Sequence, residues 1–262
     1  MIGVFDSGVG GMTVAKAIED LCPQLPLLYF GDLARSPYGS KSTEVITACS
    51  CRNTDFLLSQ GAEAVVIACN SAAAAAAETL RQQYAVPVID VVSATVEKAA
   101  AVSAAGRIGI IGTRATVRSK VYEQRLQAVR PGCQIISQAC PLLVPLVEED
   151  WLNKRETKMI LRRYLHPLRE RQIDTLILGC THYPLLGSLI QARMGKKVRL
   201  VDSSAEAARH LKEFLDKNPQ IGSNMAEQGR QSRFFVSDST GPVQRLADRI
   251  FGRPIHLEKV DV

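Results

Sequence analysis

Ala64-Val65-Val66-Ile67-Ala68-Cys69-Asn70-Ser71, followed by six alanines over 72–77, is the stretch that decides the fold class of this chain. A short uninterrupted apolar run is typical of a strand that is buried on both faces of a parallel sheet. Alanine is the best helix former and lets a helix pack closely, so the six alanines are interpreted as structural. The stretch therefore predicts a strand over 64–68, a short polar loop and a helix over 72–84.

The same alternation of strand and helix continues in both directions along the chain. Further helices are expected over 13–21, 42–60, 116–129, 153–170, 204–216 and 242–251. Further strands are expected over 2–5, 27–30, 86–92, 107–111, 133–137, 175–178, 198–201 and 233–237. A polar linker is expected over 218–232, and the tail over 253–262 carries no clear pattern. Strands that alternate with helices in this way predict an α/β fold.

Two strand-plus-loop units recur in the same order. Residues 2–7 align with 108–113, and residues 65–71 align with 176–182. Chance similarity between apolar strands could explain the strands alone, but a cysteine stands at the same place in the second pair. We therefore expect two similar α/β domains, each placing loops beyond the carboxyl ends of its strands. The expected domains comprise residues 1–92 plus 205–262 and residues 93–204, with the active site in the cleft between them.

Composition excludes several other classes. The chain has 262 residues, of which 46% are hydrophobic and 22% charged, and these values are typical of a globular protein. Its longest uncharged apolar stretch, 64–77, is too short to span a bilayer. No secretory signal precedes the first strand, so a cytoplasmic protein with free thiols is expected from the seven cysteines. The net charge of +6 could attract nucleic acid or an acidic small molecule, although a solvated basic surface explains it equally well.

Cys69 and Cys180 are the two cysteines in positions that suggest reactivity. Each follows a buried strand and precedes a helix or a turn, where backbone N–H groups can stabilise a thiolate. The other five cysteines are interpreted as small buried hydrophobes. The spacing within Cys49-Ser50-Cys51 and Cys180-Thr181-His182 does not match a common zinc site, so no metal is expected. The loop over 6–11 only weakly resembles a nucleotide-binding turn, yet its N–H groups could bind a carboxylate.

Two thiols on opposite sides of one cleft favour a particular reaction. One thiolate could remove a proton from one face of a carbon, and the other thiol could return a proton to the opposite face. This is racemisation. The α-proton of an amino acid is only weakly acidic, so such a site also needs donors that bind the carboxylates strongly.

Five motifs cover residues 6–14 (DSGVGGMTV), 36–39 (SPYG), 68–72 (ACNSA), 140–148 (CPLLVPLVE) and 178–186 (LGCTHYPLL). Together they resemble the glutamate racemases of the aspartate/glutamate racemase family. The likeness runs in order from Ile2 to about Ser203 and thins out beyond residue 205. One departure is that the family usually has threonine where this chain has Ser71, which keeps the hydroxyl group.

The resemblance implies two pseudosymmetric α/β domains with mainly parallel sheets and a cofactor-independent enzyme of the cytoplasm. It would interconvert L-glutamate and D-glutamate and supply D-glutamate for peptidoglycan, and a homodimer is a common arrangement. Nucleic acid and membrane are not expected partners. By motif, Cys69 and Cys180 are implied as the acid/base residues, with Asp6 assisting the first and His182 the second. The implied substrate contacts are Asp6, Ser7, Tyr38, Gly39, Asn70, Ser71, Thr181 and His182, with Thr113 and Thr116 as further candidates.

Other interpretations remain open from the residues alone. An aspartate racemase of the same fold would differ only in pocket contacts. A cysteine hydrolase using Cys180 and His182 would leave Cys69 without a role. A binding protein that closes over an acidic ligand would tolerate Cys69→Ala, whereas a racemase would not. Individually, Asp6 and Ser7 could also cap a helix, and Tyr38 could simply pack in a turn.

Overall fold

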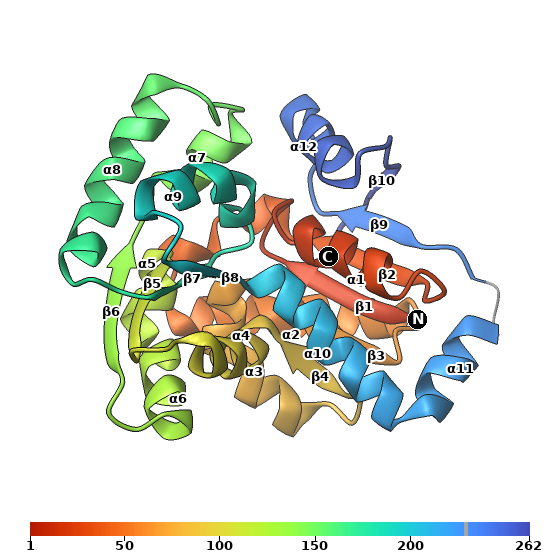
Figure 1. Cartoon of the computed structure of the whole chain (residues 1–262). Coiled ribbons are helices and arrows are strands. Elements are labelled where there is room, and N and C mark those ends of the chain that lie inside the picture. The colour runs from red at the N-terminus through yellow and green to blue at the C-terminus, as the bar shows by residue number, and fades with distance from the viewer. Residues whose placement is uncertain (228–229) are drawn as a thin grey trace.

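The computed structural model describes residues 1–227 and 230–262 and contains two parallel sheets (Figure 1). All strand pairs in both sheets are parallel. The first sheet has six strands in the order β10 (Leu257–Lys259), β9 (Arg233–Val236), β2 (Leu27–Gly31), β1 (Ile2–Asp6), β3 (Ala64–Ile67) and β4 (Val88–Asp90). The second has four in the order β6 (Gln134–Ala139), β5 (Arg107–Gly112), β7 (Thr175–Gly179) and β8 (Arg199–Asp202). We call each sheet with its helices the first and the second lobe.

Helices surround both sheets and bury the apolar strands, as expected for an α/β fold. The described part of the chain contains α1 (Met12–Leu21), α2 (Thr43–Ser59), α3 (Asn70–Gln83), α4 (Val91–Val102), α5 (Arg114–Ser119), α6 (Val121–Val129), α7 (Leu143–Glu148), α8 (Arg155–Glu170), α9 (Gly187–Met194), α10 (Ser203–Lys217), α11 (Pro219–Glu227) and α12 (Gly241–Phe251). Short 3-10 helices η1 (Leu33–Arg35), η2 (Tyr38–Ser40) and η3 (Tyr183–Leu186) lie in the loops.

The internal repeat predicted from the sequence is present in the strand order. The first lobe contains the run β2-β1-β3-β4, and the second contains the equivalent run β6-β5-β7-β8. The aligned segments are thus β1 with β5 and β3 with β7. In the first sheet β1 pairs with β3, and in the second sheet β5 pairs with β7 in the same way. The expected pair of pseudosymmetric α/β halves is confirmed.

This strand order places the functional loops. In an open parallel sheet, ligands bind outside the carboxyl ends of the strands where the direction of winding reverses. That point lies between β1 and β3 in the first lobe and between β5 and β7 in the second. The loops that follow these four strands begin with Ser7, Ala68, Thr113 and Cys180.

Two helices carry the chain between the lobes. α4 leads from β4 to β5, α10 leads back from β8 to β9, and the two helices pack against each other. The segment after residue 205 rejoins the first sheet, as expected, and the tail adds the edge strand β10. Our domain boundaries at 92/93 and 204/205 fall inside these helices, and the division into two domains stays a prediction.

Three expected elements differ from the structure. The strand expected over 86–92 is shorter, because β4 ends at Asp90 and α4 begins at Val91. The single helix expected over 116–129 breaks at Lys120, whose φ of 55° is left-handed, so α5 and α6 are separate. The prediction of a polar linker over 218–232 is also wrong for much of that segment, because Pro219–Glu227 forms α11. Proline suits the first position of a helix, and Met225 is fully buried in the core, which stabilises this polar segment as a helix. Residues 228 and 229 of that linker lie outside the described residues.

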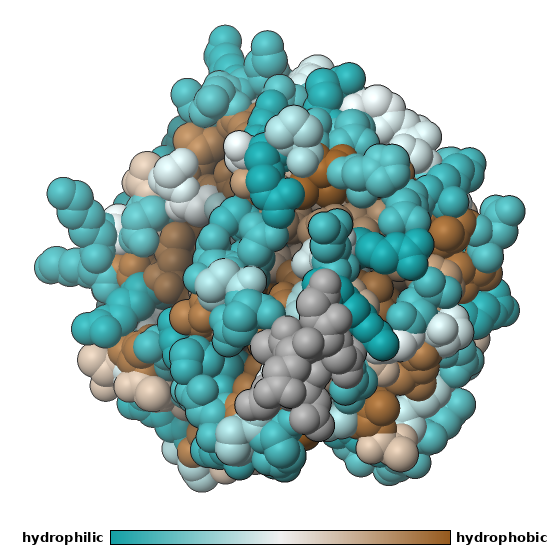
Figure 2. Space-filling model, turned by 90° about the vertical axis from the view of Figure 1, so that its right-hand side faces the viewer, coloured by the Kyte–Doolittle hydropathy of each residue, from teal (hydrophilic) through white to brown (hydrophobic). Residues whose placement is uncertain are grey.

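Among the helices of the described residues, none combines the length and apolarity that crossing a membrane would require. Figure 2 shows one face of the molecule on which polar side chains predominate and apolar side chains form small scattered groups. Scattered apolar groups of this kind are normal for a folded protein surface.

Candidate active site

Cys69 and Cys180 lie at equivalent positions and line one small cavity of about 30 Å³ between the lobes. Cys69 follows β3 and caps the amino end of α3, and Cys180 follows β7 directly. Their side chains are nearly buried, at 6% and 7% exposure. The cavity is lined by Ser7, Ser36, Pro37, Tyr38, Gly39, Cys69, Asn70, Ser71, Thr113, Val144, Cys180, Thr181 and His182. Ten of the twelve residues expected at the site are among them.

The thiol of Cys69 is held in its protonated form. Burial raises the pKa of Cys69 to about 12, and the negative charge of Asp6 acts in the same direction. The thiol donates a hydrogen bond to Ser7 Oγ, with the two atoms 3.5 Å apart. At neutral pH, Cys69 therefore carries a proton that it can donate.

Asp6 lies behind the cavity at the end of β1. Its Oδ2 accepts hydrogen bonds of 3.0 Å from the N–H groups of Gly8 and Gly11, which hold the loop after β1 in place. Its Oδ1 is buried and has no hydrogen-bond partner among the described residues. Burial raises the pKa of Asp6, although the nearby charge of His182 opposes this. The free oxygen is thus available to an ammonium group or another donor.

Cys180 belongs to a hydrogen-bonded row with His182 and Glu148. The sulfur lies 3.9 Å from His182 Nδ1, and His182 Nε2 lies 3.0 Å from Glu148 Oε1. Burial alone would lower the pKa of His182, but the hydrogen bonds to Cys180 and Glu148 together raise it to about 10. The imidazole is therefore positively charged at neutral pH and can stabilise a thiolate on Cys180.

This raised pKa predicts a pH dependence of stability. A histidine whose pKa is higher in the folded protein stabilises it fully below its unfolded pKa of about 6.5. The stabilisation is lost as the pH rises through about 10. We expect the free energy of unfolding of the wild type, minus that of His182→Asn, to be largest near pH 6 and to shrink steadily toward pH 10. Denaturant unfolding across this range measures it, and a difference that stays constant would contradict the assigned charge.

Hydroxyl groups from both lobes meet on another side of the cavity. Ser71 Oγ lies 2.8 Å from Thr113 Oγ1 and 3.3 Å from Thr116 Oγ1. Thr116 lies just behind the cavity and also contacts Thr113 at 3.1 Å. The hydroxyl that Ser71 keeps is thus part of a contact between the lobes.

Tyr38 lines the cavity, but its hydroxyl is already engaged. It donates to Asp32 Oδ2 at 2.5 Å and accepts from Asn53 Nδ2 at 3.1 Å. The ring is fully buried. A polar contact with a ligand through this hydroxyl would require these bonds to rearrange, so backbone groups of 38–39 are the better candidates for a ligand.

Glycine allows the lobes to approach closely at two points. A Cβ atom on Gly10 would lie 2.4 Å from the His182 ring, and one on Gly39 would lie 2.7 Å from Thr113 Cβ. Both distances are far below ordinary contact between heavy atoms. Glycine at these positions therefore permits the closed arrangement of the site.

We expect Gly39→Ala to lower kcat/KM for the reaction at this site by about tenfold, because overpacking of this size costs about 1–3 kcal/mol. Steady-state kinetics measure the effect. Gly187→Ala is the matched control, because Gly187 is helical and a Cβ there has no neighbour within 4 Å. If Gly39→Ala kept the wild-type value, the contact between η2 and Thr113 would have no part in forming the site.

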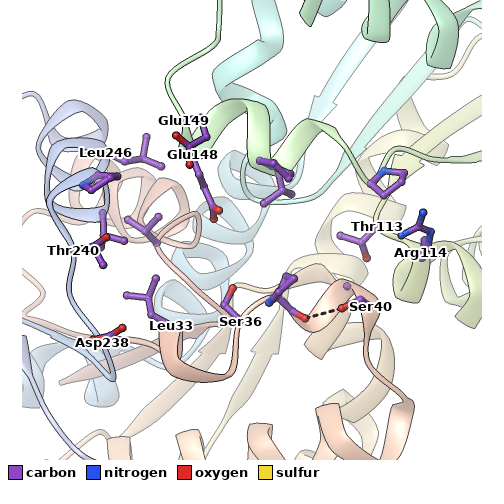
Figure 3. A pocket seen from close by; sticks show the side chains of 18 residues that line it. Leu33, Ser36, Ser40, Thr113, Arg114, Glu148, Glu149, Asp238, Thr240 and Leu246 are labelled. Carbon is purple, nitrogen blue, oxygen red and sulfur yellow. Dashed lines mark hydrogen bonds between the residues drawn. The ribbon is translucent and has the colours of Figure 1, made fainter.

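A larger pocket of about 510 Å³ adjoins the small cavity (Figure 3). It lies between the segments 33–40 and 238–246 of the first lobe and the segments 113–114 and 141–149 of the second. Figure 3 shows Thr113 and Arg114 across the pocket from Leu33, Asp238 and Thr240, and Glu148 facing into it. The residues that line both spaces are Ser36, Pro37, Gly39, Thr113 and Val144. The outer pocket has the size of a small-molecule site, whereas the inner cavity is much smaller.

Some residues at the site had no role in the sequence analysis. Glu148 ends the motif over 140–148, yet nothing in that motif indicates that its carboxylate bonds to His182. Tyr122 and Ser203 contact Asn70, and no local pattern marks either of them. Among residues 1–227 and 230–262, no group of three or more His, Cys, Asp or Glu side chains is arranged to hold a metal ion.

Two parallel α/β lobes thus face each other, and each contributes one cysteine to the cavity between them. The chain belongs to the Asp/Glu/Hydantoin racemase family, whose profile matches residues 5–211. It is 43% identical to a glutamate racemase of Geobacter metallireducens over 251 residues, which is 96% of this chain and 92% of that protein.

Solved structures support the same assignment. The crystal structure of the glutamate racemase isoform RacE1 from Bacillus anthracis matches with a TM-score of 0.95 and 37% identity, covering 100% of this chain and 97% of that one. Glutamate racemase from Francisella tularensis in complex with D-glutamate matches with a TM-score of 0.90 and 32% identity, covering 99% and 96%. An aspartate racemase of Picrophilus torridus, at 18% identity and a TM-score of 0.57, shares the fold.

Proposed function

We propose that this protein interconverts L-glutamate and D-glutamate without a cofactor, using Cys69 and Cys180 as the two acid/base groups. The observation that carries the proposal is the position of these cysteines at the ends of equivalent strands, where both line one small cavity. Relatives that share the fold and more than a third of the sequence are glutamate racemases.

The hydrogen-bond partners of the two cysteines suit the reaction of L-glutamate. The Cys180 thiolate, stabilised by the His182 cation, takes the α-proton and becomes a thiol. The negative charge left on the α-carbon spreads into the neighbouring carboxylate. The Cys69 thiol then delivers its proton to the opposite face, which gives D-glutamate and leaves Cys69 as the thiolate. The same steps in reverse convert D-glutamate, and this assignment of faces follows the family.

Donors around the cavity suit the charged groups of the substrate. Ser7, Asn70, Ser71, Thr113 and Thr181 line the cavity and bring hydroxyl, amide and backbone N–H groups to the two carboxylates. The unpartnered Asp6 Oδ1 can accept a hydrogen bond from the substrate ammonium. Glutamate would reach the inner cavity through the outer pocket, since Ser36, Pro37, Gly39, Thr113 and Val144 line both spaces.

The proposal includes a cellular setting. The enzyme supplies D-glutamate for peptidoglycan from the cytoplasm and acts as a homodimer, as the resemblance to glutamate racemases implies. Size-exclusion chromatography with light scattering measures the oligomeric state. Depletion of the protein in its host, with rescue by added D-glutamate, tests the supply role.

The activity itself is tested by circular dichroism of L-glutamate incubated with the protein in reducing buffer without added pyridoxal phosphate or metal. We expect the glutamate signal to decay to zero and the signal of L-aspartate to persist. Decay with aspartate instead would establish an aspartate racemase. Binding of glutamate with no decay of either signal would favour a non-catalytic binding protein.

A further inference from the structure

Tyr122, Asn70 and Ser203 form a buried chain of hydrogen bonds beside the inner cavity. Tyr122 Oη donates to Asn70 Oδ1 at 2.6 Å, and Asn70 Nδ2 donates to Ser203 Oγ at 3.3 Å. Ser203 Oγ in turn donates to the carbonyl of Leu178 at 3.0 Å. None of the three side chains is more than 2% exposed.

The chemistry of these groups permits only one donor-to-acceptor direction along this series of hydrogen bonds. The hydroxyl of Ser203 has a single proton, which goes to the Leu178 carbonyl, so it can only accept from Asn70. The amide must therefore turn its Nδ2 to Ser203 and its Oδ1 to Tyr122. Burial raises the pKa of Tyr122 above its usual value, so the phenol stays protonated and remains a donor.

This series of hydrogen bonds connects the surroundings of both thiols. Asn70 is the neighbour of Cys69 and lines the cavity, while Leu178 lies two residues before Cys180 on β7. Tyr122 comes from α6 in the second lobe, so its bond to Asn70 crosses between the lobes. One N–H of the Asn70 amide is used by Ser203, which leaves the second N–H as the donor that the amide can offer to a ligand.

We propose that Tyr122 is a positioning residue that, together with Ser203, fixes the orientation of the Asn70 amide, so that the amide presents N–H to a substrate carboxylate. A flipped amide would present its oxygen, which repels a carboxylate. The inference rests on the proposed function in that the carboxylate is that of glutamate. Tyr122 itself acts through Asn70 and does not line the cavity.

Tyr122→Phe tests the proposal because it keeps the buried ring and removes the hydroxyl. We expect the KM for both enantiomers, and the Kd of D-glutamate from calorimetry, to rise about tenfold, with kcat changed less than about twofold. Tyr84→Phe is the matched control. Tyr84 ends α3 on the side away from Cys69, and its hydroxyl donates to Asp55 on α2. KM and Kd of this variant should stay at the wild-type values.

A double variant shows whether Tyr122 acts through Asn70. Tyr122→Phe combined with Asn70→Ala should raise Kd no further than Asn70→Ala alone, because the amide to be oriented is already gone. If the double variant raised Kd by the product of the two single increases, the proposal would be overturned. Unchanged KM and Kd in Tyr122→Phe would overturn it as well. A fall in kcat at unchanged KM would show only a loss of folded enzyme and would also overturn it.

The calorimetric measurement separates this inference from the proposed function. A wild type that binds glutamate without racemising it would refute the proposed reaction, while the comparison of Kd values would still decide the role of Tyr122. A wild type that binds neither enantiomer would refute both.

Discussion

Cys69→Ser and Cys180→Ser should each lower kcat for glutamate racemisation by about 10²–10⁴-fold, while D-glutamate still binds. General acid–base catalysis contributes about this much, and a serine hydroxyl is a far weaker acid than a thiol. The substitution changes one buried atom and leaves the surrounding hydrogen-bond donors in place. Circular dichroism measures turnover, and calorimetry measures binding on the same samples.

Cys133→Ser is the matched control for both variants. Cys133 is as buried as the two candidate cysteines, at 6% exposure, but it precedes β6 at the opposite end of the second sheet. It should therefore keep wild-type turnover. Near-normal turnover in either Cys69→Ser or Cys180→Ser would refute the two-thiol mechanism.

His182→Asn should lower kcat/KM by about 10- to 100-fold. The imidazolium beside Cys180 is lost, and a charge-assisted hydrogen bond of this kind is worth about 1.5–3 kcal/mol. The loss must be equal in both directions, because the enantiomers of glutamate have equal free energies in water. Steady-state kinetics starting from each enantiomer measure it.

The control for this prediction is His166→Asn. His166 is exposed on α8, where it pairs with Glu170 far from the cavity, so both rates should stay unchanged. If His182→Asn retained wild-type kcat/KM, the charge of His182 would not assist Cys180. Unequal losses in the two directions would point to an error in one of the measured rates.

The sequence was sufficient to predict the parts of the fold that local pattern determines. Apolar runs such as 64–68 and 175–178 mark buried parallel strands, and the recurrence of the strand-plus-cysteine unit predicts the two equivalent lobes. Because parallel strands end at one edge of a sheet, these units also bring Cys69 and Cys180 toward one cleft. The site residues came from motifs and their order along the chain.

Features that depend on tertiary contacts could not be predicted in this way. The break between α5 and α6 depends on a left-handed conformation at Lys120, and no glycine at that position indicates it in the sequence. The segment of α11 is polar in composition, and the burial of Met225 stabilises it as a helix. The contacts of Glu148 with His182 and of Tyr122 with Asn70 join residues 34 and 52 positions apart. The fold of the second lobe brings the first pair together, and the packing of the two lobes brings the second pair together.

The most direct test of two opposed thiols is racemisation of L-glutamate in heavy water, followed by proton NMR of the α-position at low conversion. Two separate acid/base groups predict that newly formed D-glutamate carries deuterium while the remaining L-glutamate keeps its proton. Deuterium appearing in the L-glutamate pool as fast as in the product, or D-glutamate that retains the original proton, would show a single base and contradict the mechanism.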